Sequence, residues 1–367
     1  MDGITDAAFR RLIAHTHPAS VSFTEFVNVE GLARGAVSML KAFQYSELER
    51  PIVAQIYGTE EDSFYKCALM VCALGFDGID INMGCPAKKV ERRGAGAGLI
   101  ETPEHAQTII RSVQKARDDW ANGITLAEAG IRPRLITAIE KMCTSRREEH
   151  PPYKGDTGGN SDFLTPLPSL QGGLTEQSSF NPRLHSENRK RLPVSVKTRI
   201  GTCESCIETW IPNLLEMDID ALTVHGRTLK QMYTGSANWE VIARIAKIVK
   251  DSGKETLFLG NGDITDLEDG KNRCETAKTN GALIGRALFG NPWFFSGKIP
   301  ESEERLKTAI LHSQIYEECF PDAPFFPMRK HLGWYAKGFD GAKELRNAFM
   351  HTNSAEEVAL KIQEIQF

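Results

Sequence analysis

One cysteine of this sequence has the type and the position to do chemistry. Cys85 lies in NMGCP (82–86), where an apolar strand opens into a loop. A thiol there can donate a proton and a thiolate can attack an electrophile, but a cysteine can also simply fill space in the core. No histidine beside Cys85 in the sequence supports its activation as a nucleophile, so packing residue and proton donor are the two main interpretations.

Two glycine-containing segments, LGNGDI (259–264) and IGRAL (284–288), have the composition of a phosphate site. Glycine lets backbone N–H groups approach a phosphate closely, and Arg286 can add charge-assisted hydrogen bonds. Glycine also serves tight turns. The segments therefore predict either a pair of turns or, as the arginine favours, a site for a phosphate-bearing cofactor or substrate.

Lys197 interrupts an apolar strand, PVSVKTRIG (193–201). Because a buried lysine is costly without a partner, this position predicts a carboxylate partner, an anionic ligand or an electron-rich ring beside the ammonium group. The spacing of CESC (203–206) suits a metal or redox pair, but no second cysteine pair or close histidine pair completes a zinc site. We predict no metal site.

A basic and aromatic segment, MRKHLGWYAKGFDGAKELR (328–346), lies near the end of the chain. Basic and aromatic side chains together can bind a nucleic-acid backbone and its bases, whereas the alternative is an ordinary solvated helix face. The formal net charge of −4 gives no support to nucleic-acid binding, so any basic surface must be local.

The elements that must position these residues alternate along the chain. Short, largely apolar runs rich in β-branched residues predict seven strands. Helical patterns lie between most of them, for example at 61–75, 103–116 and 238–253. The predicted strands are 21–26, 51–58, 78–84, 193–201, 221–227, 255–264 and 281–289.

This alternation predicts a parallel α/β fold, either an open doubly wound sheet or a TIM (β/α)8 barrel. Glycines at the last strand ends favour the barrel. Seven strands are one too few, and residues 4–15 have a helical pattern, so we predict a barrel lacking its first strand. Polar residues recur at the carboxyl ends of the strands, where barrel active sites lie: Gln55, Asn82, Cys85, Lys197, Arg199, His225, Arg227, Asn261, Asp263 and Arg286.

The chain divides into two predicted domains. Residues 1–295 form the barrel, with an inserted and partly irregular segment at about 119–191 that is rich in Gly, Pro, Ser and Asn. Residues 300–367 form a helical domain. The eight scattered cysteines indicate reduced thiols, and no apolar run is long enough for a transmembrane helix. We therefore expect a cytoplasmic protein without membrane attachment, and a monomer.

Several blocks of the sequence, taken together and in order, resemble the tRNA-dihydrouridine synthases, flavoenzymes that reduce specific uridines in tRNA. Two blocks contain the most specific motifs: NMGCP lies within DINMGCPAKKV…GAGAGL (80–99), and HGRT…Y.G.A.W lies within LTVHGRTLKQMYTGSANW (222–239). The others are MDGITDAAFR (1–10), QIYG (55–58), PVSVKTRIG (193–201), GNGDI (260–264), GALIGRALFGNPW (281–293) and MRKHLGWYAKGF (328–339).

The resemblance implies a barrel that binds FMN and a C-terminal helical domain that binds tRNA. It makes Cys85 the general acid and places Asn82 and Arg227 at the target uracil. Arg329, Lys330 and His331 match the helix that faces tRNA. The implied FMN contacts are Met1 and Asp2 through their backbone, Gln55 and Lys197 at the ring, His225 near the ring and phosphate chain, and Asn261, Gly262, Asp263, Gly285 and Arg286 at the phosphate.

The implied reaction begins when NADPH, or NADH, reduces FMN. A hydride then passes from flavin N5 to C6 of uracil, and Cys85 supplies a proton to C5 from the opposite face. The target base must first be turned out of the folded tRNA.

Two departures from the family pattern lead to expectations about the fold. The family's apolar strand before the position of Met1 is not present, so an unpaired sheet edge is expected. The insertion before strand 193–201 is expected on the face away from the active site. Two alternative functions are an FMN oxidoreductase of the dihydroorotate-dehydrogenase type and a tRNA-binding homologue without flavin activity.

Overall fold

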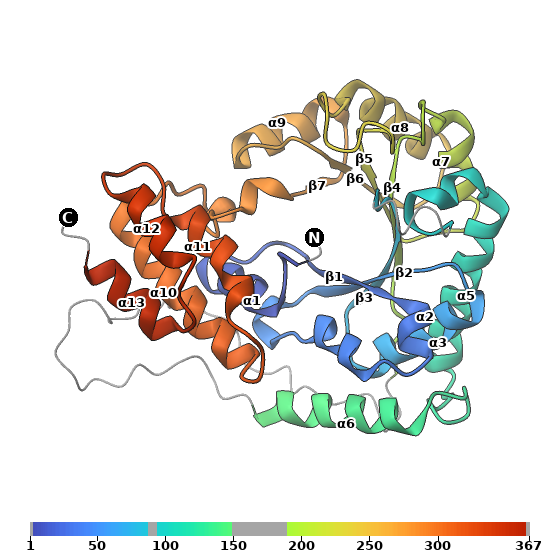
Figure 1. Ribbon diagram of the computed structural model, residues 1–367. Coiled ribbons are helices and arrows are strands. Elements are labelled where there is room, and N and C mark those ends of the chain that lie inside the picture. Colours follow the sequence, from blue (N-terminus) through green and yellow to red (C-terminus); the bar gives the residue numbers. More distant parts are fainter. Residues whose placement is uncertain (1–2, 87–93, 149–188, 365–367) are drawn as a thin grey trace, which may run out of the picture. The chain divides into compact units, whose positions relative to one another are not determined.

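The computed structural model describes residues 3–86, 94–148 and 189–364. Its centre is one parallel sheet of seven strands that follow one another in chain order (Figure 1). The seven predicted strands are therefore confirmed. Their bounds are β1 Ser22–Asn28, β2 Ile52–Tyr57, β3 Gly78–Met83, β4 Val194–Arg199, β5 Ala221–His225, β6 Leu257–Asn261 and β7 Gly281–Leu283.

The sheet is curled like part of a barrel wall but is open (Figure 1). Neighbouring strands pair from β1 to β7, with a register shift between Phe23 and Phe26 of β1, and among the described residues β7 and β1 do not pair with each other. This is the predicted barrel with one strand fewer than eight, and the expected unpaired edge lies between β1 and β7.

Helices follow most strands and cover the outer face of the sheet (Figure 1). α8 shows why they form: Val241, Ile242, Ile245 and Val249 recur at helical spacing and are buried, and Asn238 Oδ1 accepts the Val241 N–H at 2.9 Å to cap the first turn. These helices are α3 Glu61–Ala73, α5 Pro103–Ala121, α7 Ile207–Leu215, α8 Trp239–Asp251 and α9 Leu267–Ala277.

A buried ion pair ties the N-terminal helix to the loop before β2. Arg10 Nε lies 2.7 Å from Glu49 Oε2, and Arg10 also donates to the carbonyl oxygens of Thr5 and Gln44. This part contains α1 Ala7–Thr16 and α2 Val29–Ala33. The 3₁₀ helices among the described residues are η1 Val37–Phe43, η2 Glu47–Glu49, η3 Gly96–Glu101, η4 Arg286–Leu288, η5 Phe294–Ser296 and η6 Phe326–Met328.

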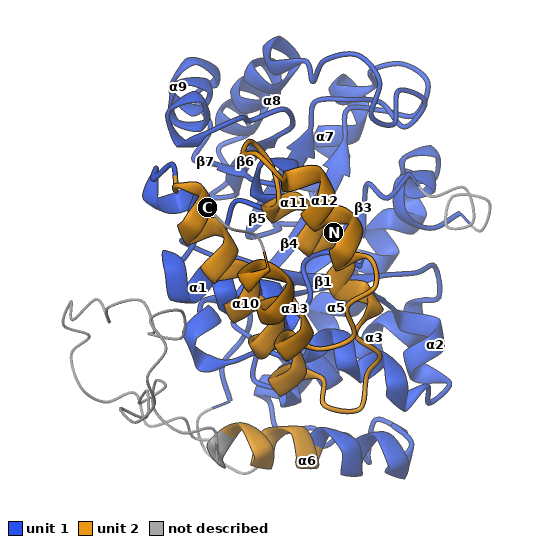
Figure 2. Cartoon of the chain, turned by 60° about the vertical axis from the view of Figure 1, so that its left-hand side comes forward, with its two compact units in different colours: residues 1–139, 183–299 blue, residues 140–182, 300–367 orange. Residues whose placement is uncertain are grey.

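The chain forms two compact units (Figure 2). Unit 1 comprises residues 1–139 and 183–299 and contains the sheet; unit 2 comprises residues 140–182 and 300–367. The core of unit 2 is apolar, with Leu332, Tyr335, Phe349 and Val358 fully buried. Its helices are α10 Ser302–Cys319, α11 Arg329–Tyr335, α12 Ala342–Phe349 and α13 Ala355–Gln363.

The predicted insertion begins within the last turns of α5. α6, Pro133–Glu148, lies inside it, and residues 149–188 lie outside the described part of the chain. No helix among the described residues is both long enough and apolar enough to span a membrane.

Candidate active site

Polar side chains gather at the carboxyl ends of the strands, because alternate residues of each strand point to the same face of the sheet. Residues two apart on a strand share a face, so Asp80 and Asn82 share one face of β3, as Lys197 and Arg199 do on β4. The register places Asn82 beside Lys197, Arg199 beside His225, and His225 beside Asn261. Five neighbouring strands, β2 to β6, thus contribute polar residues at or near their carboxyl ends, where barrel active sites lie.

A chain of buried hydrogen bonds joins β2, β3 and the loop that carries Cys85. Gln55 Nε2 donates to Asp80 Oδ2 at 2.8 Å, and Asn82 Nδ2 donates to Gln55 Oε1 at 2.9 Å. Asn82 Oδ1 then accepts the backbone N–H groups of Gly84 at 3.1 Å and Cys85 at 2.9 Å. Each side chain in this chain is at least nine-tenths buried, so the loop starts from a rigid base.

Cys85 itself is 9% exposed and its loop is held from two further directions. Its carbonyl oxygen accepts the Ala97 N–H at 3.3 Å, which ties Cys85 to η3. On the other side, Arg199 Nε donates to the Gly84 carbonyl oxygen at 2.8 Å. A backbone fixed on both sides of the thiol limits the positions that the thiol can take.

Arg199 also connects this loop to the segment after β5. Its Nη1 donates to the carbonyl oxygens of Thr228 at 3.0 Å and Met232 at 3.2 Å, and the residue is 3% exposed. The guanidinium thus donates hydrogen bonds to three backbone oxygens. Arg199 has a structural task at the site, which the sequence analysis did not assign to it.

Lys197 and Asp80 affect each other's pKa through their charges, although they do not form an ion pair. Burial, with Arg199 nearby, lowers the pKa of Lys197 to about 8, although Asp80 and Cys85 act in the opposite direction. Burial raises the pKa of Asp80 to about 6 against hydrogen bonds from Ser195 and Gln55 and the charge of Lys197. Among the described residues no carboxylate lies within ion-pair distance of Lys197 Nζ, so this ammonium group can act toward a ligand.

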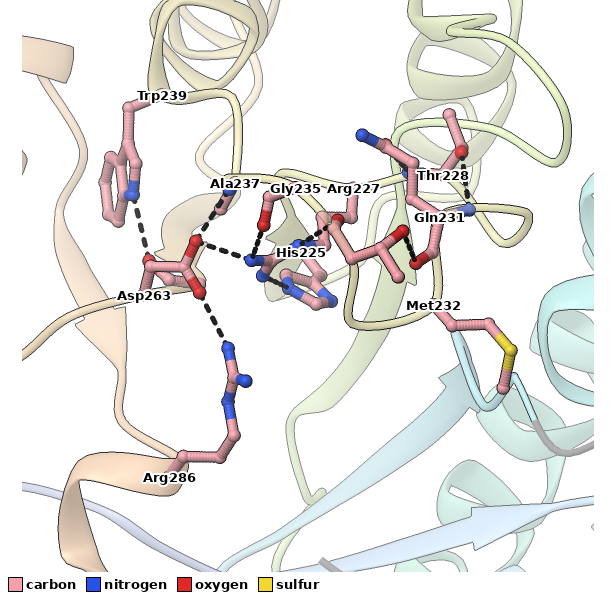
Figure 3. Close-up of polar contacts among 12 residues, drawn as sticks. His225, Arg227, Thr228, Gln231, Met232, Gly235, Ala237, Trp239, Asp263 and Arg286 are labelled. Atoms are coloured by element: carbon pink, nitrogen blue, oxygen red, sulfur yellow. Dashed lines mark hydrogen bonds and ion pairs between the residues drawn. The ribbon is translucent and has the colours of Figure 1, made fainter.

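An acidic side chain between two arginines forms the other half of the site (Figure 3). Asp263 Oδ2 lies 2.6 Å from Arg227 Nη2, and Asp263 Oδ1 lies 2.7 Å from Arg286 Nη2. The Ala237 N–H also donates to Oδ2 at 2.7 Å. Arg227 is 2% exposed, whereas half of the Arg286 side chain is exposed. Asp263 thereby holds Arg286 in place and leaves part of its guanidinium available.

His225 lies inside this positive field as a neutral ring. Burial, with the charges of Lys197, Arg199, Arg227 and Arg286, lowers the pKa of His225 to about 2. Its Nε2 lies 3.2 Å from Arg227 Nη1, which suits an unprotonated nitrogen that accepts from the guanidinium. Four cations around one neutral imidazole create a region that favours an anionic group.

The turn after β6 needs its glycine. Gly262 has a φ of +127°, and a Cβ there would lie 2.5 Å from the Ala237 Cβ and 2.9 Å from the His225 ring. The Gly262 carbonyl oxygen accepts the Trp239 indole N–H at 3.0 Å. The turn therefore packs directly against the β5 loop, close to the arginine pair.

Most of the predicted site residues lie at the carboxyl ends of β2 to β7. Asn261 donates through Nδ2 to the Leu283 carbonyl oxygen at 2.8 Å, and Gly285 precedes η4. Met1 and Asp2 lie outside the described residues. The Asp263 carboxylate is occupied by two arginines, so a phosphate contact by this residue would have to come from its backbone.

The residues predicted to face tRNA belong to α11 of unit 2. Arg329 donates to the Thr352 carbonyl oxygen at 3.1 Å and to Asn353 Oδ1 at 2.8 Å, and Lys330 is half-buried. His331 is only 1% exposed, and its ring lies 4.8 Å from His312 and 5.0 Å from Trp334. The interpretation of His331 as an RNA-contacting residue is therefore wrong: it is part of the core of this unit.

Sequence reasoning also missed residues that support the site. Asp80 and Ser195 were given no role, although Asp80 stands two residues before Asn82 in an otherwise apolar strand and must share its face. That spacing was the available signal. Ser195 carried none, because its partner Asp80 is 115 positions away.

Comparison with known proteins gives one family and several relatives. Residues 1–123 and 185–366 match the family Dihydrouridine synthase (Dus). A probable tRNA-dihydrouridine synthase 2 of Bacillus subtilis (strain 168) is 30% identical over 373 residues, covering 100% of this chain and 92% of that protein. A probable tRNA-dihydrouridine synthase of Staphylococcus aureus (strain COL) is 29% identical, with 100% and 91% covered.

Solved structures give only distant likenesses. DHODH from Eimeria tenella in complex with ferulenol has a TM-score of 0.40 at 15% identity, covering 79% of this chain and 64% of that one. A variant of NCR from Zymomonas mobilis has a TM-score of 0.41 at 14% identity, with 82% and 86% covered.

Proposed function

Because this chain belongs to the dihydrouridine synthase family and is thus an oxidoreductase, we propose that it reduces uridines in tRNA to 5,6-dihydrouridine. The observation that carries the proposal is the meeting of Cys85, Lys197 and the Asp263–Arg286 pair at one edge of the sheet. These three features supply a proton donor, a buried cation and an anchored phosphate-binding arginine.

The residues at this edge fit FMN. A phosphate monoester needs cationic and N–H donors, and the cations around His225 provide a field of that sign. The exposed part of the Arg286 guanidinium and the backbone of the Gly262 turn would hold the phosphate, whereas Gln55 and Lys197 would face the ring. When bound, and after reduction by NADPH or NADH, the flavin would supply the hydride for uracil C6.

Cys85 would hold the proton that uracil C5 needs. The thiol is mostly buried, and the Asn82 amide and the Arg199 guanidinium both form hydrogen bonds with the backbone of Gly84 and Cys85. A thiol kept at one place can deliver a proton to one carbon of a bound ring. Asn82 and Arg227 would contact the uracil; of the two, Arg227 already spends most of its donors on Asp263, His225 and backbone oxygens.

Recognition of tRNA outside the base would fall to unit 2. Arg329 and Lys330 on α11 are the basic residues proposed for phosphate contacts, and His331 is left out because it is buried. We also propose a division of labour between a domain of residues 1–295 that does the chemistry and a domain of residues 300–367 that docks the RNA. A monomeric, cytoplasmic enzyme remains our expectation.

The direct test is mass spectrometry of tRNA from a strain that lacks this gene, before and after complementation. Dihydrouridine at one or more positions should disappear on deletion, return with the wild-type gene, and stay absent with Cys85→Ala. Purified protein should be yellow, with flavin absorbance. Unchanged dihydrouridine in the deletion strain, or purified protein that shows no flavin binding, would contradict the proposal.

A further inference from the structure

Asp80 is a buried carboxylate that the proposed reaction does not use. All six residues of β3 are buried, and Asp80 is 1% exposed. Its two oxygens accept hydrogen bonds from Gln55 Nε2 at 2.8 Å and from Ser195 Oγ at 2.6 Å. A carboxylate in such a place is costly to bury, and apolar residues occupy the neighbouring positions of the strand. Asp80 therefore has a role that offsets the cost of burying its charge.

The direction of the hydrogen bonds suggests what that role is. An ionised carboxylate only accepts, so it decides which end of the Gln55 amide turns toward it, namely Nε2. Gln55 Oε1 is then left to accept from Asn82 Nδ2, and Asn82 Oδ1 is left to accept the N–H groups of Gly84 and Cys85. The backbone N–H groups of Gly84 and Cys85 only donate, so they fix the Asn82 amide from the other end. Without the acceptor-only Asp80, the Gln55 amide could turn over and take away the acceptor of Asn82 Nδ2.

We propose that Asp80 is a positioning residue that, through Gln55 and Asn82, orients the amide oxygen holding the backbone of Cys85. Its effect on catalysis rests on the proposed function, whereas its effect on the Cys85 loop does not. Ser195 satisfies the other oxygen of Asp80 and lies outside the chain of amides, so it serves as a matched control on the same carboxylate.

Exchanging the amide of Gln55 and the carboxylate of Asp80 tests the direction of the hydrogen bonds between Asp80, Gln55 and Asn82. At a pH high enough to keep both groups ionised, Gln55→Glu places two carboxylates face to face with no hydrogen between them, which should break the chain of hydrogen bonds. Adding Asp80→Asn restores a donor: the introduced amide can donate to the new carboxylate and accept from Ser195, while Asn82 Nδ2 keeps an acceptor. We expect Gln55→Glu to disrupt the hydrogen bonds that hold the Cys85 backbone, and the double variant Gln55→Glu with Asp80→Asn to restore them.

The measurement is the rate at which iodoacetamide alkylates Cys85, followed by peptide mass spectrometry on the full-length protein. Wild-type Cys85 should react slowly because it is 9% exposed, and exposed Cys203 serves as the internal reference. We expect Gln55→Glu to speed alkylation of Cys85 at least about fivefold, the factor that one lost hydrogen bond can give. The double variant should return to within about twofold of wild type, and Ser195→Ala should stay there.

Buried Cys67 and Cys72 report general unfolding in the same samples. A double variant that still reacts fast at Cys85, or whose Cys67 and Cys72 react as well, has not restored the network and overturns the proposal. Equal acceleration by Ser195→Ala overturns it too. The assay needs no tRNA and no electron donor, so wild-type protein that forms no dihydrouridine would contradict the proposed function and leave this inference standing.

Discussion

The two halves of the site use different chemistry. The amide side, made of Gln55, Asp80, Asn82 and Ser195 on β2 to β4, is buried and holds its groups through neutral donors. The arginine side, made of His225, Arg227, Asp263 and Arg286 around β5 to β7, is held by charge pairs. Neutral amides suit the donors and acceptors of ring edges, whereas guanidinium groups suit phosphate.

The two carboxylates make the difference visible. Burial raises the pKa of Asp80 to about 6, because its direct partners are a neutral amide and a hydroxyl. Burial also acts to raise the pKa of Asp263, but the Ala237 N–H and the two arginines outweigh it and lower this pKa. An aspartate thus orients neutral amides on the amide side, where it is Asp80, and balances the charge of two arginines on the arginine side, where it is Asp263.

Asp263→Asn should break the arginine side most strongly. It would leave Arg227, which is 2% exposed, without its countercharge. We expect a loss of about 3 kcal/mol in the free energy of unfolding, the lower end of the range for one partner of a buried pair, because the Asp263 side chain is 26% exposed. Urea denaturation measures it. Asp218→Asn, which breaks the exposed pair with Lys254, is the control and should cost under about 1 kcal/mol. Equal losses would show that burial of Arg227 does not matter.

Cys85→Ala should separate flavin binding, which depends on the arginine side, from proton transfer by the thiol that the amide side holds. The arginine side is untouched, so flavin content and NADPH oxidation should remain. Dihydrouridine formation should fall by a factor of ~10² or more, the scale of a general-acid contribution. Single-turnover reduction of tRNA checks this, with Cys203→Ala, an exposed thiol, as the control. Full activity toward tRNA in Cys85→Ala would remove the thiol from the mechanism.

The opposite pKa directions predict opposite responses of stability to pH. For Asp80 the folded-state pKa lies above the unfolded one, so the folded protein binds more protons between about pH 4 and 6. Its contribution therefore decreases as pH rises through that window. For Asp263 the folded-state pKa is depressed, so its contribution is present above about pH 4 and is lost as pH falls below that value.

Asp80→Asn should accordingly gain stability relative to wild type between pH 4 and 6, on the order of 2 kcal/mol across the window. A constant hydrogen-bond cost can shift the whole curve but not its slope. Unfolding by urea at several pH values measures the difference. A difference between the two proteins that does not change with pH would show that Asp80 ionises at its ordinary pKa in the folded state.

Sequence patterns predicted the sheet well because each strand carries its own signal. β3, for example, is buried at all six positions and is an apolar run apart from two polar residues. A tight turn was one of the two alternatives predicted for the segment that contains Gly262, and the backbone conformation and close packing at this position exclude other residues. Such properties depend on local structure, which a single segment encodes.

The amide side could not be predicted in the same way, because it depends on register. Ser195 meets Asp80 across 115 positions, and only the pairing of β3 with β4 brings them together. His331 shows a related failure: it belongs to a basic run, but it is buried because α11 turns it toward His312. The run of charges did not show which face of the helix packs inward.

Arg286→Ala should give the smallest of these effects and tests whether the arginine side binds phosphate. The side chain is 51% exposed, so loss of its charge should cost little stability. Loss of a charge-assisted hydrogen bond to phosphate should weaken flavin binding about tenfold, measured by fluorescence titration of flavin-free protein. Arg244→Ala is the matched control, because Arg244 is similarly exposed and pairs with Glu208 on the outer helices. Since both variants lose one half-exposed arginine from an ion pair, a general effect of charge would weaken binding equally in both. Only a phosphate contact makes Arg286 the more sensitive position, and riboflavin, which lacks the phosphate, should then bind wild type and Arg286→Ala with the same affinity.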